Sequence, residues 1–376
     1  TLHPSLERAT EHQPAARAAI VAALASGPAH AYALVGPAGS GKAEVARAFA
    51  AELLASGAAD SEEARRRGLA DPSPHPDLAW LRPPGNQHLV DDIRERVIAQ
   101  VPYRPFEGQR RVFVVEDAEA MAEESQNALL KTLEEPPSYA HLLLISAEPE
   151  ALLETVRSRC AEIRFRSLPR AVVEQRLAAS IDLPPEGIAA LAALADGDLG
   201  RARFLGSDRG ARLRELTEGC CRSAIAGDVA ERPWAGVLKL AAEIGKAEGE
   251  AVAAAAGARA DEIGKGRDAD RIRREGGEAA KRVERRRRTE AIDEALALTA
   301  AWFLDMIAVA DDVPSHLRNV DRLAELQRLV ADREPARARR AAELAMATRR
   351  RLEVNVSEEL ALEALFHRIT AIFSAP

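Results

Sequence analysis

Residues 112–146 read VFVVEDAEAMAEESQNALLKTLEEPPSYAHLLLIS, and this stretch decides the fold. Its two apolar runs, residues 112–115 and 142–145, flank a segment whose leucines recur on one helical face and which stops at a pair of prolines. A strand, a helix and a second strand at this spacing predict a βαβ unit, and hence a parallel sheet with helices on both faces. Glu116 and Asp117 close the first strand, at the edge where open α/β sheets bind ligands.

A glycine-rich loop lies upstream, where residues 36–43 read GPAGSGKA between a strand candidate and a helical pattern. This context and the G-x-x-x-x-G-K spacing predict a phosphate-binding loop, in which backbone N–H groups and a lysine surround the phosphates. The alternative is a glycine-rich turn without a ligand. Ala43 stands where a Ser or Thr hydroxyl would bind Mg²⁺, so the pattern indicates the ancestry of such a loop but argues against working hydrolysis. The expected phosphate ligands are Gly36, Gly39, Gly41 and Lys42.

Two further motifs follow the strand-end acids. Ser146 ends the second apolar run, and Ser158-Arg159-Cys160 comes shortly after it. Taken with the phosphate loop, these motifs resemble the clamp-loader branch of the AAA+ ATPases. The resemblance implies that Arg159 is an arginine finger, offered in trans to a neighbour's γ-phosphate, and that Ser146 is the first sensor. The structural alternatives are a surface salt bridge at Arg159, a turn residue at Ser146 and a packed small hydrophobe at Cys160.

The chain departs from the pattern of active family members at the acids and at the second sensor. Active members end the strand in Asp and then Glu, which hold Mg²⁺ through water and polarise the attacking water, whereas here the order is Glu116-Asp117. Catalysis by positioning is sensitive to errors of about 1 Å, so this inversion and Ala43 are two defects in one site. Gly200 stands at the second-sensor position, and Arg201 one residue later points elsewhere on a helix. We therefore expect no independent ATPase activity and no required cofactor. Vestigial ATP or ADP binding stays open, as does plain solvation of the two acids.

Composition limits the other classes of function. A formal net charge of −7 argues against a protein that coats DNA by bulk charge. Three cysteines without a C-x-x-C motif indicate a reducing compartment, and no apolar run reaches the roughly 18 residues of a membrane span, so we expect a cytoplasmic protein without membrane contact. Relatives often carry four cysteines before the motif His75-Pro76-Asp77. Residues 58–69 contain none, which predicts no zinc and a structural role for His75 and Asp77.

The resemblance implies three domains. An α/β AAA+ phosphate-loop domain covers residues 1–168, an all-α small lid domain covers 169–208, and an all-α collar covers 209–376. Within the collar, residues 247–290 are rich in Ala, Glu and Arg, a pattern typical of a solvated helix face or a mobile loop. The sharper alternative is a nucleic-acid contact through residues 265–288.

The end of the chain, LEVNV at 352–356 and then LALEAL at 360–365, resembles the closing motif of the family's collar. The expected function is that of a rigid clamp-loader subunit that helps to place a sliding clamp on primed DNA. The implied partners are motor subunits of the gamma or tau type and a delta subunit in a heteropentamer, and, through that complex, the clamp and primer–template DNA. The alternatives are an active motor ATPase, a DNA-repair relative and a helical nucleic-acid-binding protein.

Overall fold

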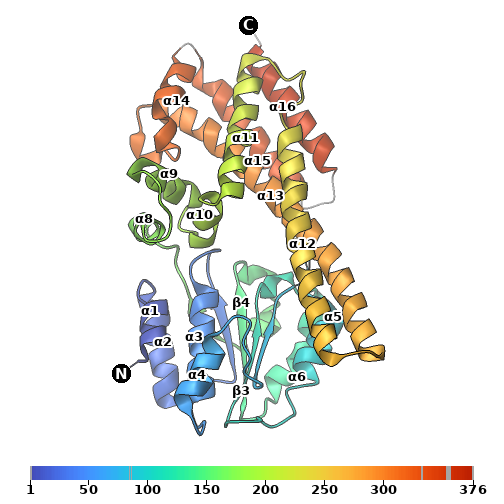
Figure 1. Cartoon of the computed structure of the whole chain (residues 1–376). Helices are drawn as coiled ribbons and strands as arrows, with labels where there is room; N and C mark the ends of the chain where they lie inside the picture. Colours follow the sequence, from blue (N-terminus) through green and yellow to red (C-terminus); the bar gives the residue numbers. More distant parts are fainter. Residues whose placement is uncertain (1, 84, 86, 332, 353–356, 375–376) are drawn as a thin grey trace. The chain divides into compact units, whose positions relative to one another are not determined.

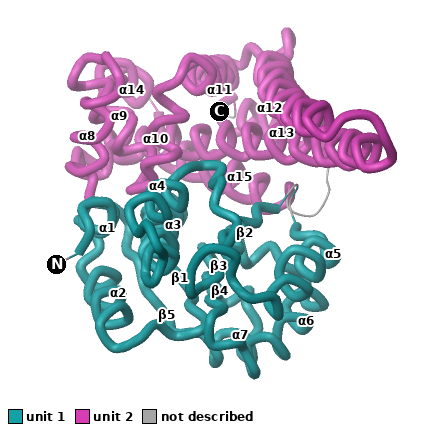
Figure 2. The backbone as a smooth tube through the Cα atoms, turned by 60° about the horizontal axis from the view of Figure 1, so that its bottom comes forward, with its two compact units in different colours: residues 1–168 teal, residues 169–376 magenta. Residues whose placement is uncertain are grey.

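The computed structural model describes residues 2–83, 85, 87–331, 333–352 and 357–374. The chain divides into two compact units, residues 1–168 and 169–376 (Figure 2). Unit 1 contains the sheet, and unit 2 consists of helices in its described part.

Unit 1 is built on a parallel sheet of five strands in the order β2-β3-β4-β1-β5. In its register Val35 pairs with Ser146, and Val115 pairs with Leu144. The carboxyl ends of β1, β3 and β4 therefore meet at one edge of the sheet. The strands are β1 (Ala31–Val35), β2 (Leu78–Leu81), β3 (Arg111–Val115), β4 (Ala140–Ser146) and β5 (Ala161–Arg164).

Helices cover both faces of this sheet (Figure 1). Val114 of β3 packs in one hydrophobic cluster with Phe49, whereas its neighbour Val115 packs in another with Leu129. Successive side chains of a strand point to opposite faces of the sheet, and in a central parallel strand both faces are covered by helices. The first face carries α1 (Pro4–Ala9), α2 (Pro14–Ser26) and α3 (Lys42–Ala55), with α4 (Ser61–Leu69) against α3; the second carries α5 (Val90–Ile93), a π-helical turn (Arg94–Ile98), α6 (Glu123–Glu134) and α7 (Glu154–Arg157). Short 3₁₀ turns span Ala118–Ala120 and Pro149–Ala151. The predicted parallel α/β fold is confirmed.

The regular elements that the structure describes in unit 2 are all helices, as the sequence predicted. Its helices are α8 (Arg170–Ala178), α9 (Pro185–Ala195), α10 (Leu199–Leu205), α11 (Asp208–Ala226), α12 (Ala235–Ile263), α13 (Arg267–Ala310), α14 (Leu323–Val330), α15 (Pro335–Leu352) and α16 (Glu358–Ser374). Single 3₁₀ turns at Pro314–His316 and Val320–Arg322 precede α14. Of the expected closing motif, residues 353–356 lie outside the described part of the chain, and residues 360–365 belong to α16. None of the helices that the structure describes is both long and apolar enough to cross a membrane.

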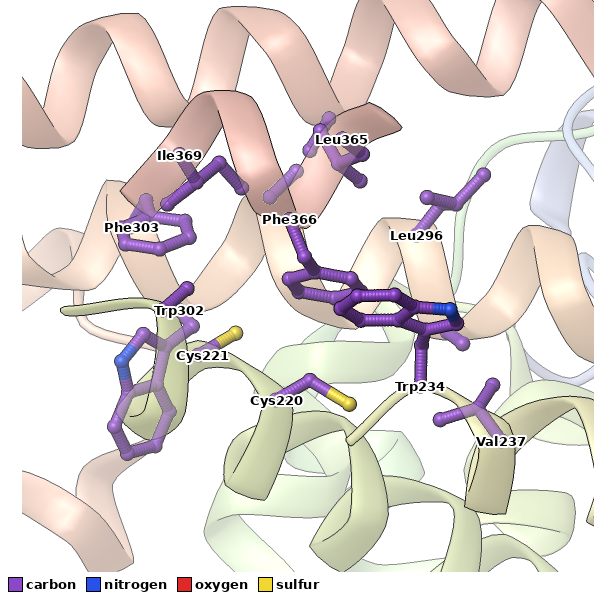
Figure 3. Close-up of a cluster of buried hydrophobic side chains, with 14 of the residues drawn as sticks. Cys220, Cys221, Trp234, Val237, Leu296, Trp302, Phe303, Leu365, Phe366 and Ile369 are labelled. Carbon is purple, nitrogen blue, oxygen red and sulfur yellow. The ribbon is translucent and has the colours of Figure 1, made fainter. Parts of the chain in front are cut away.

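The core of unit 2 is centred on a buried tryptophan. Trp234 precedes α12 and stacks on Phe366 of α16, with 6.0 Å between the ring centroids (Figure 3). Cys220 and Cys221 of α11 belong to the same cluster and are fully buried. Burial raises the pKa of the Cys220 thiol to about 12, so it behaves as a small apolar side chain.

The charged segment 247–290 forms most of a long hairpin between α12 and α13, which lie side by side in Figures 1 and 2. Small residues let the two helices approach closely. A Cβ atom on Gly245 would lie 2.4 Å from the carbonyl oxygen of Glu284, and one on Gly276 would lie 2.2 Å from the Ala256 Cβ atom. The close packing of α12 against α13 therefore requires small residues at the contact, and the charged side chains lie on the outer faces of the two helices.

Candidate nucleotide site

The phosphate loop connects β1 to α3 at the sheet edge described above. The Gly36 N–H donates to the carbonyl oxygen of Ser146 at 3.2 Å, which fixes the start of the loop to the end of β4. Gly36 has a φ of +148°, and a Cβ atom there would lie 2.4 Å from the carbonyl oxygen of Phe165. Gly39 and Gly41 also have positive φ values, of +65° and +89°. These conformations and this close approach favour glycine, and they give the loop the backbone freedom that a phosphate cradle needs.

Lys42 turns its amine back into this loop. Its Nζ atom donates to the carbonyl oxygens of Gly36 and Pro37, both at 2.5 Å, and lies 3.5 Å from the Ser40 hydroxyl. The side chain is buried. The lysine thus stabilises the loop through two of its carbonyl groups, one of which, that of Pro37, also accepts from the Ser40 N–H at 3.4 Å.

Gln13 holds the loop from the other side. Its Nε2 atom donates to the carbonyl oxygens of Ser40 at 2.9 Å and of Arg166 at 2.7 Å, and its Oε1 atom accepts from the Arg166 N–H. A fully bonded, buried amide therefore ties the segment before α2 to the loop and to the chain after β5. No sequence motif marks this glutamine.

Glu116 is engaged by two donors from the neighbouring strand segment. Its Oε2 atom accepts from the Trp80 Nε1–H at 2.7 Å and from the Arg82 Nε–H at 2.8 Å. The Glu116 N–H still pairs with the Leu81 carbonyl oxygen, and its own carbonyl oxygen lies 2.7 Å from His88 Nε2. Glu116 is therefore fixed by its backbone as well as by its side chain, and it is not a freely solvated acid.

Arg82 extends the contact to Asp71. Its Nη1 and Nη2 atoms donate to the two carboxylate oxygens of Asp71 at 3.2 and 2.8 Å. Burial opposes the charge on Arg82, but the hydrogen bonds to Asp71 and Glu116 outweigh it and raise the pKa of the guanidinium. The hydrogen bond from Arg82 in turn lowers the pKa of Asp71.

Arg47 of α3 completes this group. Its Nη2 atom lies 2.9 Å from Asp71 Oδ2, and its guanidinium lies over the Trp80 ring, 4.1 Å from the centroid. Two arginines and two carboxylates surround one tryptophan, and their formal charges cancel. We call Arg47, Asp71, Trp80, Arg82 and Glu116 the ion cage.

The other two predicted polar residues lie at the same edge. Asp117 has a left-handed backbone, with φ 50° and ψ 53°, a conformation that Asp tolerates better than most residues. Ser146 is fully buried, and its Oγ atom accepts from the Glu148 N–H at 3.2 Å. The hydroxyl therefore supports the turn after β4, which is the structural alternative considered for it.

Arg159 lies just beyond α7, close to α6. Its Nη2 atom donates to Glu134 Oε1 at 2.6 Å, and its Nη1 atom donates to the Thr155 carbonyl oxygen at 2.9 Å. The side chains of Arg159 and Glu134 are 34% and 50% exposed, so the ion pair is open to solvent. Cys160 beside it is largely shielded, and burial raises the pKa of its thiol to about 12, which argues against a nucleophilic role.

His75 and Asp77 both have structural contacts. The Asp77 carboxylate accepts from the backbone N–H groups of Phe106 and Glu107 at 2.8 and 3.0 Å, and its own N–H donates to His75 Nδ1. Burial lowers the pKa of His75, which favours the neutral ring that such an acceptor role requires. Among the described residues, no group of three His, Cys, Asp or Glu side chains could hold a metal ion.

Arg201, next to the expected second-sensor position, contacts α13. It forms a bidentate ion pair with Glu294 of α13, with nitrogen–oxygen distances of 2.8 to 3.1 Å. Asp198 caps the start of α10 by accepting from the Arg201 N–H. The Arg201 side chain is therefore held by an ion pair inside unit 2.

The residues at this edge can be compared with the two parts of Mg²⁺–ATP, its phosphate groups and its metal ion. The glycine conformations and Lys42 fit a phosphate group. The metal half does not fit, because Ala43 offers no oxygen and the Glu116 carboxylate is bonded to Trp80 and Arg82. No chemical step through a bound metal follows from this donor set.

Five cage and loop residues were absent from the sequence-based site: Gln13, Arg47, Asp71, Trp80 and Arg82. A signal existed for one of them. β2 pairs with β3 so that Leu81 lies opposite Val115, which places Arg82 opposite Glu116. An alignment of the short LAWLR segment with VFVVE would have placed the arginine beside the acid.

The comparisons with known proteins concern this same α/β unit. Residues 13–169 match the family described as DNA polymerase III, delta subunit. The DNA polymerase III subunit delta' of Pseudomonas aeruginosa is 40% identical over 176 residues, which are 45% of this chain and 53% of that protein. The delta' subunit of Bacillus subtilis is 31% identical over 150 residues, 39% of this chain and 45% of that protein.

The tau/gamma subunit of Haemophilus influenzae is 33% identical over 172 residues, 42% of this chain and 24% of that protein. The chain thus spans about half, or less, of the length of these curated relatives. A solved DNA polymerase III gamma subunit-related protein from Thermotoga maritima aligns over 96% of this chain and 99% of its own, with only 16% identity and a TM-score of 0.39.

Proposed function

We propose that this chain, which its relatives support as a delta-prime-type subunit of the DNA polymerase III clamp loader, is a fixed member that supplies Arg159 to the ATP of a neighbouring motor subunit. Its own site would be hydrolytically silent. The proposed partners are motor subunits of the gamma or tau type and a delta subunit in a heteropentamer, which acts on the sliding clamp and on primer–template DNA.

The observation that carries this proposal is the state of Arg159. The guanidinium is held at the surface by one carbonyl oxygen and one half-exposed carboxylate. An exposed ion pair of this kind contributes at most about 1 kcal/mol, because water and salt screen it. A triphosphate on a neighbouring subunit carries more negative charge than Glu134 and matches the planar guanidinium with two oxygens, so it can take over the arginine.

The silence of the chain's own site is supported by Ala43 and by the contacts of Glu116. Its fixed character is supported within unit 2, where the expected lid helices α8, α9 and α10 group with the collar helices in one compact unit. The Arg201–Glu294 ion pair joins α10 to α13. A rigid-body switch needs two parts that move against each other, and this contact opposes such movement between α10 and α13.

The test is ATP turnover by a clamp loader reconstituted with this subunit, in the presence of clamp and primed DNA. We expect Arg159→Ala to lower turnover at least about tenfold, which is roughly 1.4 kcal/mol of transition-state stabilisation. Arg159→Lys should recover little, since an ammonium group lacks the planar fork. Arg157→Ala is the matched control, because Arg157 lies two residues away and is equally exposed, with only a long contact of 3.7 Å to Glu162.

The same preparations provide the contrary outcomes. Each complex is first checked for full assembly by size-exclusion chromatography, so that lost turnover is not lost subunit. An Arg159→Ala complex that assembles and turns over ATP like the Arg157→Ala complex would show that Arg159 is only structural. ATP hydrolysis by the isolated chain would show that it is a motor in its own right.

A further inference from the structure

The ion cage has a property that the sequence motifs do not contain: one acid of the strand-end pair already has a cation. Glu116 Oε2 accepts two hydrogen bonds, one of them from the charged Arg82 at 2.8 Å. The opposite edge of the same guanidinium is bound by both oxygens of Asp71. Arg82 therefore lies between two carboxylates, in the way that a bound cation would.

A second cation closes the group. Arg47 pairs with Asp71 at 2.9 Å and stacks on the Trp80 ring, so that Asp71 is shared by two arginines. The cage comprises elements from four places in the chain: α3, the loop before β2, the end of β2 and the end of β3. Each charged group has an opposite partner within 3 Å.

A divalent cation would have to displace these contacts. Mg²⁺ binds through a carboxylate or its water shell and tolerates little distortion of its octahedral geometry. A metal ion at Glu116, even one bound through Oε1, would share the carboxylate with the Arg82 guanidinium that is bonded to Oε2. The two positive charges would repel each other, so the ion would bind favourably only if Arg82 left. Departure of Arg82 would also leave Asp71 with Arg47 alone. The energetic balance therefore favours the internal arginine over a metal.

We infer that Arg82 is a built-in cation that occupies the place of a divalent metal at Glu116, so that this site excludes Mg²⁺ even where its phosphate loop is intact. This inference gives a structural reason for the proposed absence of ATP hydrolysis at this site, and its functional importance rests on that proposal. Its evidence is the geometry of the single chain, and its test uses the single chain as well.

The test measures metal binding to the full chain with Tb³⁺ as the probe, read by luminescence that a nearby tryptophan sensitises. Trp80 donates a hydrogen bond to Glu116, so an ion at this carboxylate lies beside it. Wild type should show no sensitised emission that depends on Glu116. Arg82→Ala leaves two carboxylates, those of Asp71 and Glu116, around one vacated space, and we expect it to bind Tb³⁺ at least about tenfold more tightly than wild type.

Four further variants make the result specific. Arg82→Gln removes the charge but keeps polar bulk, and should gain binding in the same direction if Arg82→Ala fails to fold. Adding Glu116→Gln to either variant should abolish the gain. Arg94→Ala is the matched control, since it frees Glu124 from an exposed ion pair of 2.9 Å in the same unit and should leave binding unchanged.

Competition by Mn²⁺, followed by the electron paramagnetic resonance of the free ion, should rank the variants in the same order. The inference is overturned if wild type binds the ion at a site that Glu116→Gln removes. It is equally overturned if folded Arg82→Ala and Arg82→Gln gain no affinity over the Arg94→Ala control. Neither result depends on the turnover of the assembled complex, so this inference and the role of Arg159 can fail separately.

Discussion

The ion pair between Arg201 and Glu294 should be among the strongest in unit 2, and its energy can be measured. Arg201 Nε lies 2.8 and 3.1 Å from the two oxygens of Glu294, and Nη2 lies 2.9 Å from one of them. The side chains are only 24% and 15% exposed. Hydrogen bonds to charged groups contribute about 1.5–3 kcal/mol, whereas exposed ion pairs contribute about 0.2–1 kcal/mol. Because this pair is only partly exposed, we expect its coupling energy at the lower end of the range for hydrogen bonds to charged groups, about 1.5 kcal/mol.

A double-mutant cycle measures this coupling energy. Arg201→Ala, Glu294→Ala and the double variant are unfolded in urea and followed by tryptophan fluorescence, because Trp234 and Trp302 report on the core of unit 2. Hydrogen exchange of the α10 amides gives a second, local readout of the same coupling.

The matched control is a surface pair in the same unit. Arg209 and Glu248 are 3.8 Å apart and 50% and 44% exposed, so their coupling energy should stay below about 0.5 kcal/mol. A coupling between Arg201 and Glu294 no larger than this control would refute the argument. It would mean that the lid is not held to the collar by this contact, and that the proposed rigidity lacks its best-defined support.

Two further predictions concern packing. Trp234→Ala should lower the free energy of unfolding by about 3–5 kcal/mol and the melting temperature of unit 2 by roughly 6–20 °C. Trp234→Phe should cost under about 1.5 kcal/mol, because the indole N–H has no hydrogen-bond partner in this core and the stacking on Phe366 is kept. Calorimetry distinguishes the two variants, and equal losses of stability would contradict this account. Gly36→Ala should destabilise unit 1 by at least about 2 kcal/mol in urea unfolding, since its Cβ atom would overlap the Phe165 carbonyl oxygen at 2.4 Å, and an unchanged midpoint would show that the loop can move away.

The sequence predicted what local pattern and spacing determine. The apolar runs around Val114 and Leu144 predicted buried parallel strands, because a strand covered on both faces has no polar alternation. The positions of Gly36, Lys42 and Glu116 at one sheet edge also followed, since parallel strands share the direction of their carboxyl ends.

The sequence did not predict the contacts that join separate segments. Arg82 and Glu116 are 34 residues apart, and the pairing of β2 with β3 brings them together. Asp71, 11 residues before Arg82, reaches the same guanidinium through the loop before β2. Likewise, Arg201 looked like a misplaced sensor because helix periodicity says nothing of its partner. Glu294 is 93 residues away and becomes its partner only when α10 packs near α13.

The inverted acid pair acquires a physical reason from the cage. Read as a motif, Glu116 is an acid whose carboxylate extends one methylene too far for a water-mediated metal ligand. In the structure that extra methylene, about 1.5 Å of reach, lets one oxygen accept from both Trp80 and Arg82 on the adjoining strand segment. An Asp at this position would fall short of both donors and would leave Arg82 with Asp71 alone. The Glu is therefore suited to an ion pair across two strands as well as unsuited to a metal, so the proposed silence of the site and the ion pair at the sheet edge have the same structural cause.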